Sequence, residues 1–184
     1  MKINLASQSP ARLELLRKAG FEVEPFPQDI NETTSQTEPG KVVEDLALQK
    51  LDAFMKSSDF KADEISLASD TLIYFNGRLI GKARSNGEAK NQIASFAGHT
   101  HKVYSGYALF YKGTLYHGFD CTDVSFREIP EEELEKYIDS MEWKGAAGSY
   151  HIQGLAETFI SEVKGDINTV IGLPLNKVLE IIRI

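Results

Sequence analysis

The chain of 184 residues has a single cysteine, Cys121, so no disulfide can form within it and no cysteine cluster can hold zinc. It has no apolar run near the length that spans a bilayer, and its first residues lack a signal-peptide pattern. Basic residues are the minority, with 20 Lys and Arg against 27 Asp and Glu, and the net charge is −7. General nucleic-acid binding needs a dense basic patch and is therefore not expected. We expect a cytoplasmic protein that does not associate with membranes.

Hydrophobic residues make up 42% of the chain, enough to bury one substantial core or two small lobes that share a cleft. No internal repeat, low-complexity tract or flexible linker interrupts the sequence, so residues 1–184 are expected to form a single domain. Strand and helix patterns are interleaved, but two hairpins exclude an all-parallel sheet, and we expect an α/β protein with a mixed sheet. Strands are expected near residues 2–5, 21–26, 65–69, 72–75, 78–80, 103–111, 115–127 and 158–163, with helices beginning near Ser9, Pro39, Ser85, Pro130 and Pro174.

The start of the chain predicts a strand that turns directly into a helix through two serines, Ser7 and Ser9. Ser9 suits the N-cap position and Pro10 the first helical position, which places Arg12 in the first turn. A cation there opposes the positive end of the helix dipole, at a cost of roughly 0.3–1 kcal/mol unless an anion lies between them. The segment fits either a phosphate site or an ordinary capped helix with an exposed arginine.

Asp70 and Lys50 are the most informative charged residues in the middle of the chain. Asp70 is expected to end the apolar strand 65–69, where sheets of this kind place ligands, and it suits a catalytic or metal-binding role. A turn-forming aspartate is the alternative. Lys50 lies on the apolar stripe of the helix that begins at Pro39, so its ammonium either meets an anion or reaches past the apolar surface into water.

Two further charged residues can join the same site. Lys82 follows Gly81 at the end of a hairpin and can point toward Asp70, although an exposed surface lysine is the alternative. Glu32 lies in a polar segment and can supply a second carboxylate to a hard divalent cation, which prefers oxygen ligands. An ordinary acidic loop fits Glu32 equally well.

Taken together, these motifs resemble the Maf family of nucleoside triphosphate pyrophosphatases over nearly the whole chain. Each motif alone is weak, but their order and spacing make the resemblance specific. The matching segments are Leu5-Ala6-Ser7-Gln8-Ser9-Pro10 with Arg12, Asn31-Glu32-Thr33, Leu46-Ala47-Leu48-Gln49-Lys50, Ser69-Asp70-Thr71, Gly81-Lys82, residues 98–103, residues 147–154 and Gly172-Leu173-Pro174-Leu175.

The resemblance implies a twisted sheet with a nucleotide cleft between two lobes, as in the Maf and ITPase folds, and hydrolysis between the α and β phosphates of a nucleotide. Asp70 corresponds to the proton acceptor for the attacking water, with Lys50 and Lys82 as its catalytic partners. A divalent cation, magnesium, manganese or cobalt, is implied at Glu32 and Asp70. The resemblance also implies a homodimer and a triphosphate cradle made of Ser7, Ser9, Arg12, Lys50 and Lys82.

Within the family, four positions bear on the choice of base: Ala11, Arg12, Thr71 and Gln153. Thr71 and Gln153 resemble the branch that acts on dTTP and UTP, whereas the branch that acts on 7-methyl-GTP has Gln and Glu there. That pyrimidine branch usually has two arginines after Ser-Pro, and here Ala11 replaces the first. We therefore expect a house-cleaning dTTP and UTP pyrophosphatase. The alternatives are a different base preference, such as 7-methyl-GTP, and a nucleotide-binding regulator of septum formation with little turnover.

Overall fold

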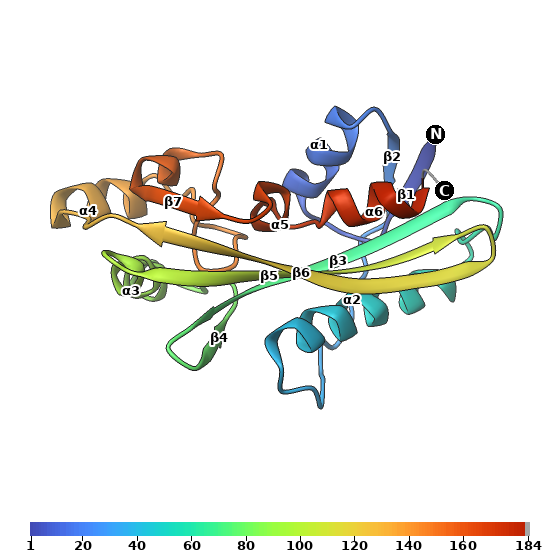
Figure 1. Ribbon diagram of the computed structural model, residues 1–184, viewed down its shortest axis with the longest axis horizontal. Helices are drawn as coiled ribbons and strands as arrows, with labels where there is room; N and C mark the ends of the chain where they lie inside the picture. The colour runs from blue at the N-terminus through green and yellow to red at the C-terminus, as the bar shows by residue number, and fades with distance from the viewer. Residues whose placement is uncertain (183–184) are drawn as a thin grey trace. The chain divides into compact units, whose positions relative to one another are not determined.

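The structure, a computed structural model, describes residues 1–182 and divides into two compact units. The first unit comprises residues 1–71, 105–120 and 172 onward, and the second comprises residues 72–104 and 121–171. Three strands, β3 (Ile65–Phe75), β5 (Thr100–Tyr111) and β6 (Thr114–Phe126), contribute residues to both units. The three strands are labelled in Figure 1.

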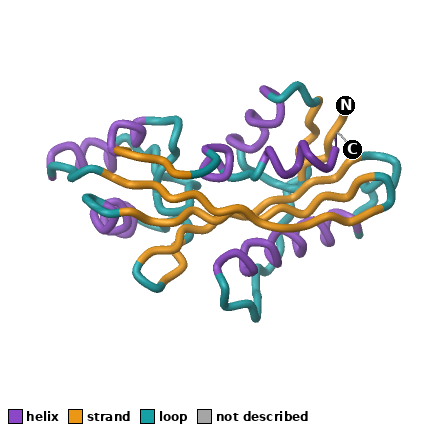
Figure 2. The backbone as a smooth tube through the Cα atoms, in the orientation of Figure 1, coloured by secondary structure: helices purple, strands orange, loops and turns teal. Residues whose placement is uncertain are grey.

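In the first unit the strand order is β2-β1-β3-β5-β6, with β1 (Lys2–Leu5) between β2 (Glu22–Pro25) and β3. β1 runs parallel to both neighbours, and Ile3 lies opposite Val23 on one side and Ile65 on the other. The helices of this unit are α1 (Pro10–Lys18), α2 (Pro39–Met55) and α6 (Leu175–Ile182). A loop without helix or strand precedes α2, as the polar composition of residues 27–37 predicts (Figure 2).

Alternate residues of the strands in the first unit pack on opposite faces, as the two-residue period of a strand requires. Leu67 belongs to the apolar cluster that includes α1 and α6, whereas the next residue, Ala68, belongs to the cluster that includes α2. Leu109 and Ala108 divide between the same two clusters. The helices of this unit therefore cover both faces of its strands, with α1 and α6 on one face and α2 on the other (Figure 1).

The second unit is built around one apolar cluster that joins strand residues to α3 (Asn86–Phe96), α4 (Glu131–Asp139) and the short helix η1 (Leu155–Phe159). β4 (Arg78–Ile80) pairs antiparallel with β3, and β7 (Ile160–Lys164) pairs antiparallel with β6. α5 (Ile167–Ile171) ends the unit. Parallel pairs in the first unit and antiparallel pairs in the second confirm the predicted mixed sheet flanked by helices.

Local signals predict several turns and helix starts correctly. The tight turn at Asn76 and Gly77 forms with φ values of 48° and 75°, as the Asn-Gly hairpin signal requires. Ser85 caps α3 by accepting a hydrogen bond from the Glu88 backbone N–H at 3.2 Å. The prediction that a strand ends at Asp70 is wrong, because β3 continues from Ile65 to Phe75. Residues 69–71 contain no glycine, proline or asparagine to break the strand, so the two expected strands form one.

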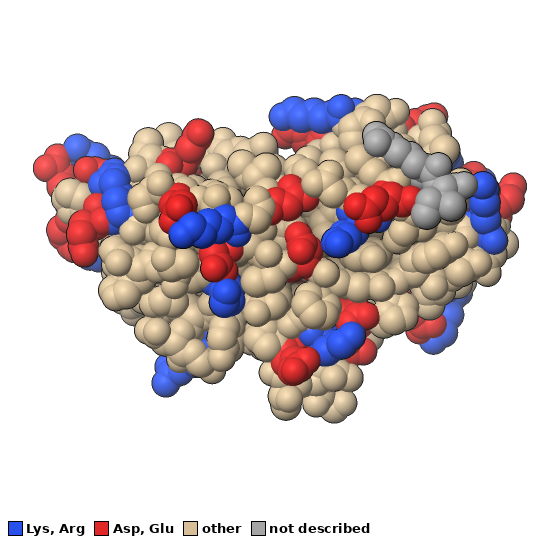
Figure 3. Space-filling view, in the orientation of Figure 1, with Lys and Arg blue, Asp and Glu red and all other residues tan. Residues whose placement is uncertain are grey.

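Lysine and arginine side chains lie close to aspartate and glutamate side chains on the face drawn in Figure 3. Among the described residues, Lys90 reaches both Glu131 and Glu135 at 2.5 Å, and Lys136 reaches Glu132 at 2.6 Å. Ion pairs this exposed add little to the stability of the folded chain. Across residues 1–182, none of the helices has the length and apolar character that crossing a membrane requires.

Candidate functional site

The first turn of α1 confirms the predicted cap. Ser9 Oγ accepts a hydrogen bond from the Arg12 backbone N–H at 3.4 Å, and Pro10 occupies the first turn. Ser7 Oγ accepts two more, from the Ser9 backbone N–H at 3.2 Å and from Arg12 Nη1 at 3.1 Å. Both serines therefore help to shape the turn and to hold Arg12 there.

Arg12 is anchored within the first unit by three oxygen atoms. Besides Ser7 Oγ, its guanidinium donates from Nε to the Gly172 carbonyl at 2.6 Å and from Nη2 to Thr71 Oγ1 at 3.0 Å. Burial lowers the pKa of Arg12, and the negative charges of Asp70 and Glu32 oppose this shift. Part of the conflict with the helix dipole is therefore relieved by the chain itself. Three of the five guanidinium N–H groups are used in these contacts.

Lys50 joins two carboxylates in the same unit. Its Nζ lies 2.5 Å from Asp70 Oδ1 and 2.9 Å from Glu32 Oε1. The side chains of Lys50 and Asp70 are only 13% and 10% exposed, whereas that of Glu32 is 46% exposed. The ammonium meets anions instead of reaching into water, which decides between the two interpretations of Lys50. The resulting pair is the most buried ion pair among the described residues, and breaking such a pair is costly.

Strand β3 places Asp70 and Thr71 side by side in sequence but on opposite faces of the strand. Asp70 reaches Lys50 on α2, whereas Thr71 and Ser69 reach the Gly172 carbonyl, at 3.3 and 2.8 Å. β1 ends at Leu5, opposite Leu67, so residues 68–71 of β3 extend past the carboxyl end of β1. Open α/β sheets bind ligands beyond the carboxyl ends of their strands, and the residues predicted for this position do lie there.

Lys82 and Gln153 belong to the second unit, and both are exposed. Lys82 forms an isolated antiparallel bridge with Ala147, and the Gly81 carbonyl accepts a hydrogen bond from the Gly148 backbone N–H at 3.0 Å. Within residues 1–182 Lys82 makes no ion pair, unlike Lys50. The assignment of Lys82 to phosphate and of Gln153 to the base stays a prediction.

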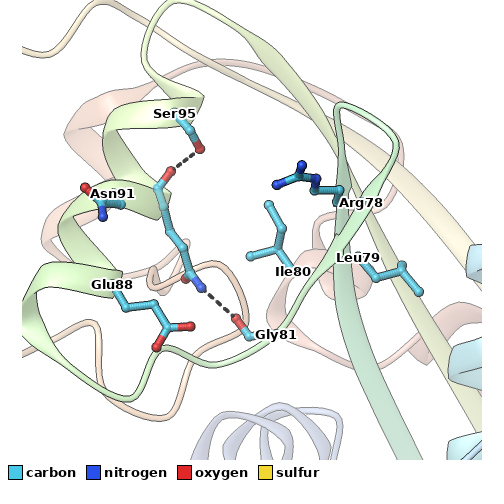
Figure 4. A pocket seen from close by; sticks show the side chains of 8 residues that line it. Arg78, Leu79, Ile80, Gly81, Glu88, Asn91 and Ser95 are labelled. Carbon is cyan, nitrogen blue, oxygen red and sulfur yellow. Dashed lines mark hydrogen bonds between the residues drawn. The ribbon is translucent and has the colours of Figure 1, made fainter.

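A pocket of about 510 Å³ lies in the second unit between β4 and α3 (Figure 4). Gln92 spans this region, because its Nε2 donates to the Gly81 carbonyl at 3.4 Å and its Oε1 accepts from Ser149 Oγ at 2.5 Å. None of the predicted site residues lines the pocket, which is formed by Arg78, Leu79, Ile80, Gly81, Glu88, Asn91, Gln92 and Ser95. Gly81 is nevertheless the neighbour of Lys82, so the same contacts hold the backbone that carries this lysine.

The predicted metal ligands can be tested on their geometry. Residues 1–182 contain no group of three or more His, Cys, Asp or Glu side chains arranged to hold a metal ion. Asp70 and Glu32 nevertheless direct one oxygen each at a single positive charge, the Lys50 ammonium. Mg²⁺ commonly binds through one or two carboxylates, with the remaining ligands supplied by water and substrate phosphates. The pair fits a divalent cation of that kind.

Three contacts around Arg12 and Thr71 are absent from the sequence-based site. Ser105 Oγ lies 2.7 Å from Thr71 Oγ1, and Ser69 Oγ and the Gly172 carbonyl complete the group. The signal available in the sequence is serine within two otherwise apolar strand segments, with Ser66 and Ser69 in residues 65–69 and Ser105 in residues 103–111. A carbonyl such as that of Gly172 has no signal, because every residue has one.

The comparisons with known proteins cover the full chain. The model of the Maf family, described as Maf-like protein, matches residues 2–184. A Pyrococcus horikoshii protein named dTTP/UTP pyrophosphatase is 39% identical over 184 residues, 100% of this chain and 97% of its own length. A Bacillus cereus protein of the same name is 38% identical over 97% of this chain and 92% of its own. Among solved structures, a HAM1 protein from Coxiella burnetii aligns over 97% of this chain and 90% of its own, with a TM-score of 0.51 and 14% identity, and supports the fold alone.

Proposed function

The chain belongs to the Maf family, and from this membership we propose that it is a nucleoside triphosphate pyrophosphatase that hydrolyses dTTP and UTP to the monophosphate and pyrophosphate. The observation that carries the proposal is the 39% identity, over the full chain, to a protein named dTTP/UTP pyrophosphatase. The buried Lys50–Asp70 pair supports it, because hydrolysis of a phosphoanhydride needs a positioned base and nearby positive charge.

In this proposal Asp70 accepts a proton from the attacking water as the new bond from the water oxygen to phosphorus forms. The bond between that phosphorus and the bridging oxygen breaks, and the products leave as monophosphate and pyrophosphate. Lys50 holds the Asp70 carboxylate in place through the 2.5 Å contact. No covalent enzyme intermediate is needed.

Glu32 and Asp70 would hold a divalent cation, magnesium, manganese or cobalt, together with phosphate oxygens of the substrate. When bound, such an ion neutralises charge on the phosphates and stabilises the charge that develops on their oxygens. Lys50 now occupies the position between the two carboxylates, so its ammonium would have to share them with the ion. Removal of divalent ions with EDTA is expected to abolish turnover and addition of magnesium or manganese to restore it.

The start of α1 supports a role in binding the phosphate chain. Two of the five Arg12 N–H groups are not used in the contacts with Ser7, Thr71 and Gly172, and they can donate to phosphate oxygens. Ser7 and Ser9 lie in the same turn and would contribute their hydroxyl groups. Thr71, bound directly to Arg12, would take part in base selection next to Ala11.

Pyrophosphate release from dTTP, UTP, CTP, GTP and 7-methyl-GTP, each with magnesium or manganese, tests the proposal. Faster release from dTTP and UTP than from the other three nucleotides is the expected result. A preference for 7-methyl-GTP would contradict the base assignment but retain the reaction. Nucleotide binding without release from any of the five would instead favour a regulatory role. The homodimer implied by the family resemblance is tested separately by sedimentation velocity.

A further inference from the structure

Ser105 on β5 is fully buried, and its Oγ lies 2.7 Å from Thr71 Oγ1. We propose that Ser105 is a positioning residue that acts through Thr71 on Arg12 and thereby sharpens the choice of base. The proposal rests on the proposed function, since it assigns base selection to Arg12 and Thr71. It adds a residue that neither the sequence motifs nor the direct contacts of Arg12 include.

The hydrogen-bond directions around Thr71 give Ser105 this role. A guanidinium only donates, so Thr71 Oγ1 accepts from Arg12 Nη2 at 3.0 Å. The Thr71 hydroxyl can still donate its one hydrogen and accept one further hydrogen bond on its second lone pair. The Gly172 carbonyl is 3.3 Å away and already accepts Arg12 Nε at 2.6 Å. Ser105 Oγ at 2.7 Å is the nearer partner, and since either hydroxyl can be the donor of this bond, the contact limits how the Thr71 hydroxyl can turn.

The direction of this hydroxyl matters for uracil and cytosine. Uracil and thymine present a carbonyl acceptor at position 4 and an N–H donor at position 3, whereas cytosine presents an amino donor and a ring-nitrogen acceptor there. A fixed pattern of donors and acceptors therefore discriminates between them, because the wrong base leaves polar groups unpaired. A hydroxyl free to rotate satisfies either base. Ser105 would thus contribute to selectivity by preventing that rotation.

A purely structural role for Ser105 makes a different prediction. Loss of a buried hydroxyl would then lower stability and leave the ratio of UTP to CTP unchanged. The chain offers a matched control in Ser66 on β3, which is also fully buried in the first unit. The Ser66 hydroxyl has no hydrogen-bond partner among the described residues, so Ser66→Ala removes a buried hydroxyl without disturbing Arg12 or Thr71.

The experiment compares the wild type with Ser105→Ala, Ser105→Thr and Ser66→Ala. Two ratios are measured: kcat/KM for UTP over CTP, and the affinity for α,β-methylene-UTP over α,β-methylene-CTP, which binds without being cleaved. Ser105→Ala is expected to lower both ratios by about three- to ten-fold, the range for one lost hydrogen bond, with the kinetic change mainly in KM. Ser105→Thr, which keeps the hydroxyl, should restore most of the selectivity, and Ser66→Ala should match the wild type.

Unchanged ratios in Ser105→Ala, or an equal loss in Ser66→Ala, would overturn the role of Ser105. Should Ser105→Thr fail to fold, the comparison of Ser105→Ala with Ser66→Ala still decides whether Ser105 affects the choice of base. Absence of UTP turnover in the wild type would instead refute the proposed function. The affinities for the two methylene analogues would then still decide whether Ser105 controls base preference.

Discussion

Lys50 Nζ lies 2.5 Å from Asp70 Oδ1, and the two side chains are the least exposed ion pair among the described residues. They come from different elements, α2 and β3, and buried apolar residues of those elements lie close to each in sequence, Leu51 next to Lys50 and Ala68 two positions before Asp70. A buried pair of this kind adds little net stability, because desolvation offsets most of the attraction. Its position past the carboxyl end of β1 fits the catalytic role proposed for Asp70.

Asp70→Asn is expected to reduce pyrophosphate release from UTP at least about 100-fold, because an amide cannot accept the proton of the attacking water. The variant should remain folded by circular dichroism, since an amide fills the same volume and Lys50 Nζ keeps Glu32 Oε1 as an anionic partner at 2.9 Å. Asp123→Asn is the matched control, because Asp123 forms an exposed pair with Lys102 at 2.7 Å in the other unit. Near-normal rates in Asp70→Asn would rule out Asp70 as the base.

Ala11→Arg is expected to raise the kcat/KM ratio of UTP over CTP, because it supplies the first of the two arginines usual in the pyrimidine branch. Ala11 lies in the first turn of α1, where another cation opposes the helix dipole by roughly 0.3–1 kcal/mol. The melting temperature without nucleotide should therefore fall slightly and recover when UTP is added. An unchanged ranking of substrates would show that position 11 does not select the base in this chain.

Much of this architecture could be predicted because its causes are local. The cap at Ser9, the turn at Asn76 and Gly77 and the capping of α3 by Ser85 each depend on residues within four positions of one another. That Lys50 needs an anionic partner followed from its position on an apolar stripe, and the family resemblance placed it in the same site as Asp70, but their direct contact was not predicted.

The contacts that fix Arg12 could not be predicted in this way. The Gly172 carbonyl lies 160 positions from Arg12 in sequence, and Ser105 lies 34 positions from Thr71. Local periodicity contains no information about such pairs. The same limitation explains the error at Asp70, where a polar residue suggested a strand end although the pairing of β3 continues through it.

Gly172→Ala directly tests the contacts that hold the Arg12 guanidinium against Gly172 and Thr71. Gly172 has φ of 123°, and a Cβ there would lie 3.3 Å from both Arg12 Nε and Thr71 Oγ1. We expect the free energy of unfolding to fall by about 1–3 kcal/mol from backbone strain, and KM for UTP to rise as Arg12 is displaced. Gly87→Ala in α3, where a Cβ meets nothing within 4 Å, should instead stabilise the protein by about 0.4–1 kcal/mol. Equal urea midpoints for the two variants would contradict this account.

The buried side chain of His101 is expected to make the free energy of unfolding depend on pH. Its ring stacks on Phe96 at a centroid distance of 4.3 Å, and Nε2 lies 2.7 Å from the Tyr150 hydroxyl. Burial lowers the pKa of His101 to about 4, and the charge of Asp123 opposes the shift only weakly. The folded state therefore binds this proton less readily than the unfolded state, whose pKa is near 6.5.

The sign of the effect follows from that difference in pKa. The contribution of His101 to stability is fully present above pH 6.5 and is lost as pH falls toward 4, because only the unfolded chain gains the proton. Between pH 7 and pH 5 the free energy of unfolding should fall by about 2 kcal/mol from this residue alone. His101→Gln keeps a polar group near Tyr150 but cannot titrate. The free energy of unfolding of this variant, measured with urea at several pH values, should therefore lack the part of the pH dependence that His101 contributes. An identical pH slope in the variant and the wild type would mean that His101 is not protonated on unfolding in this range.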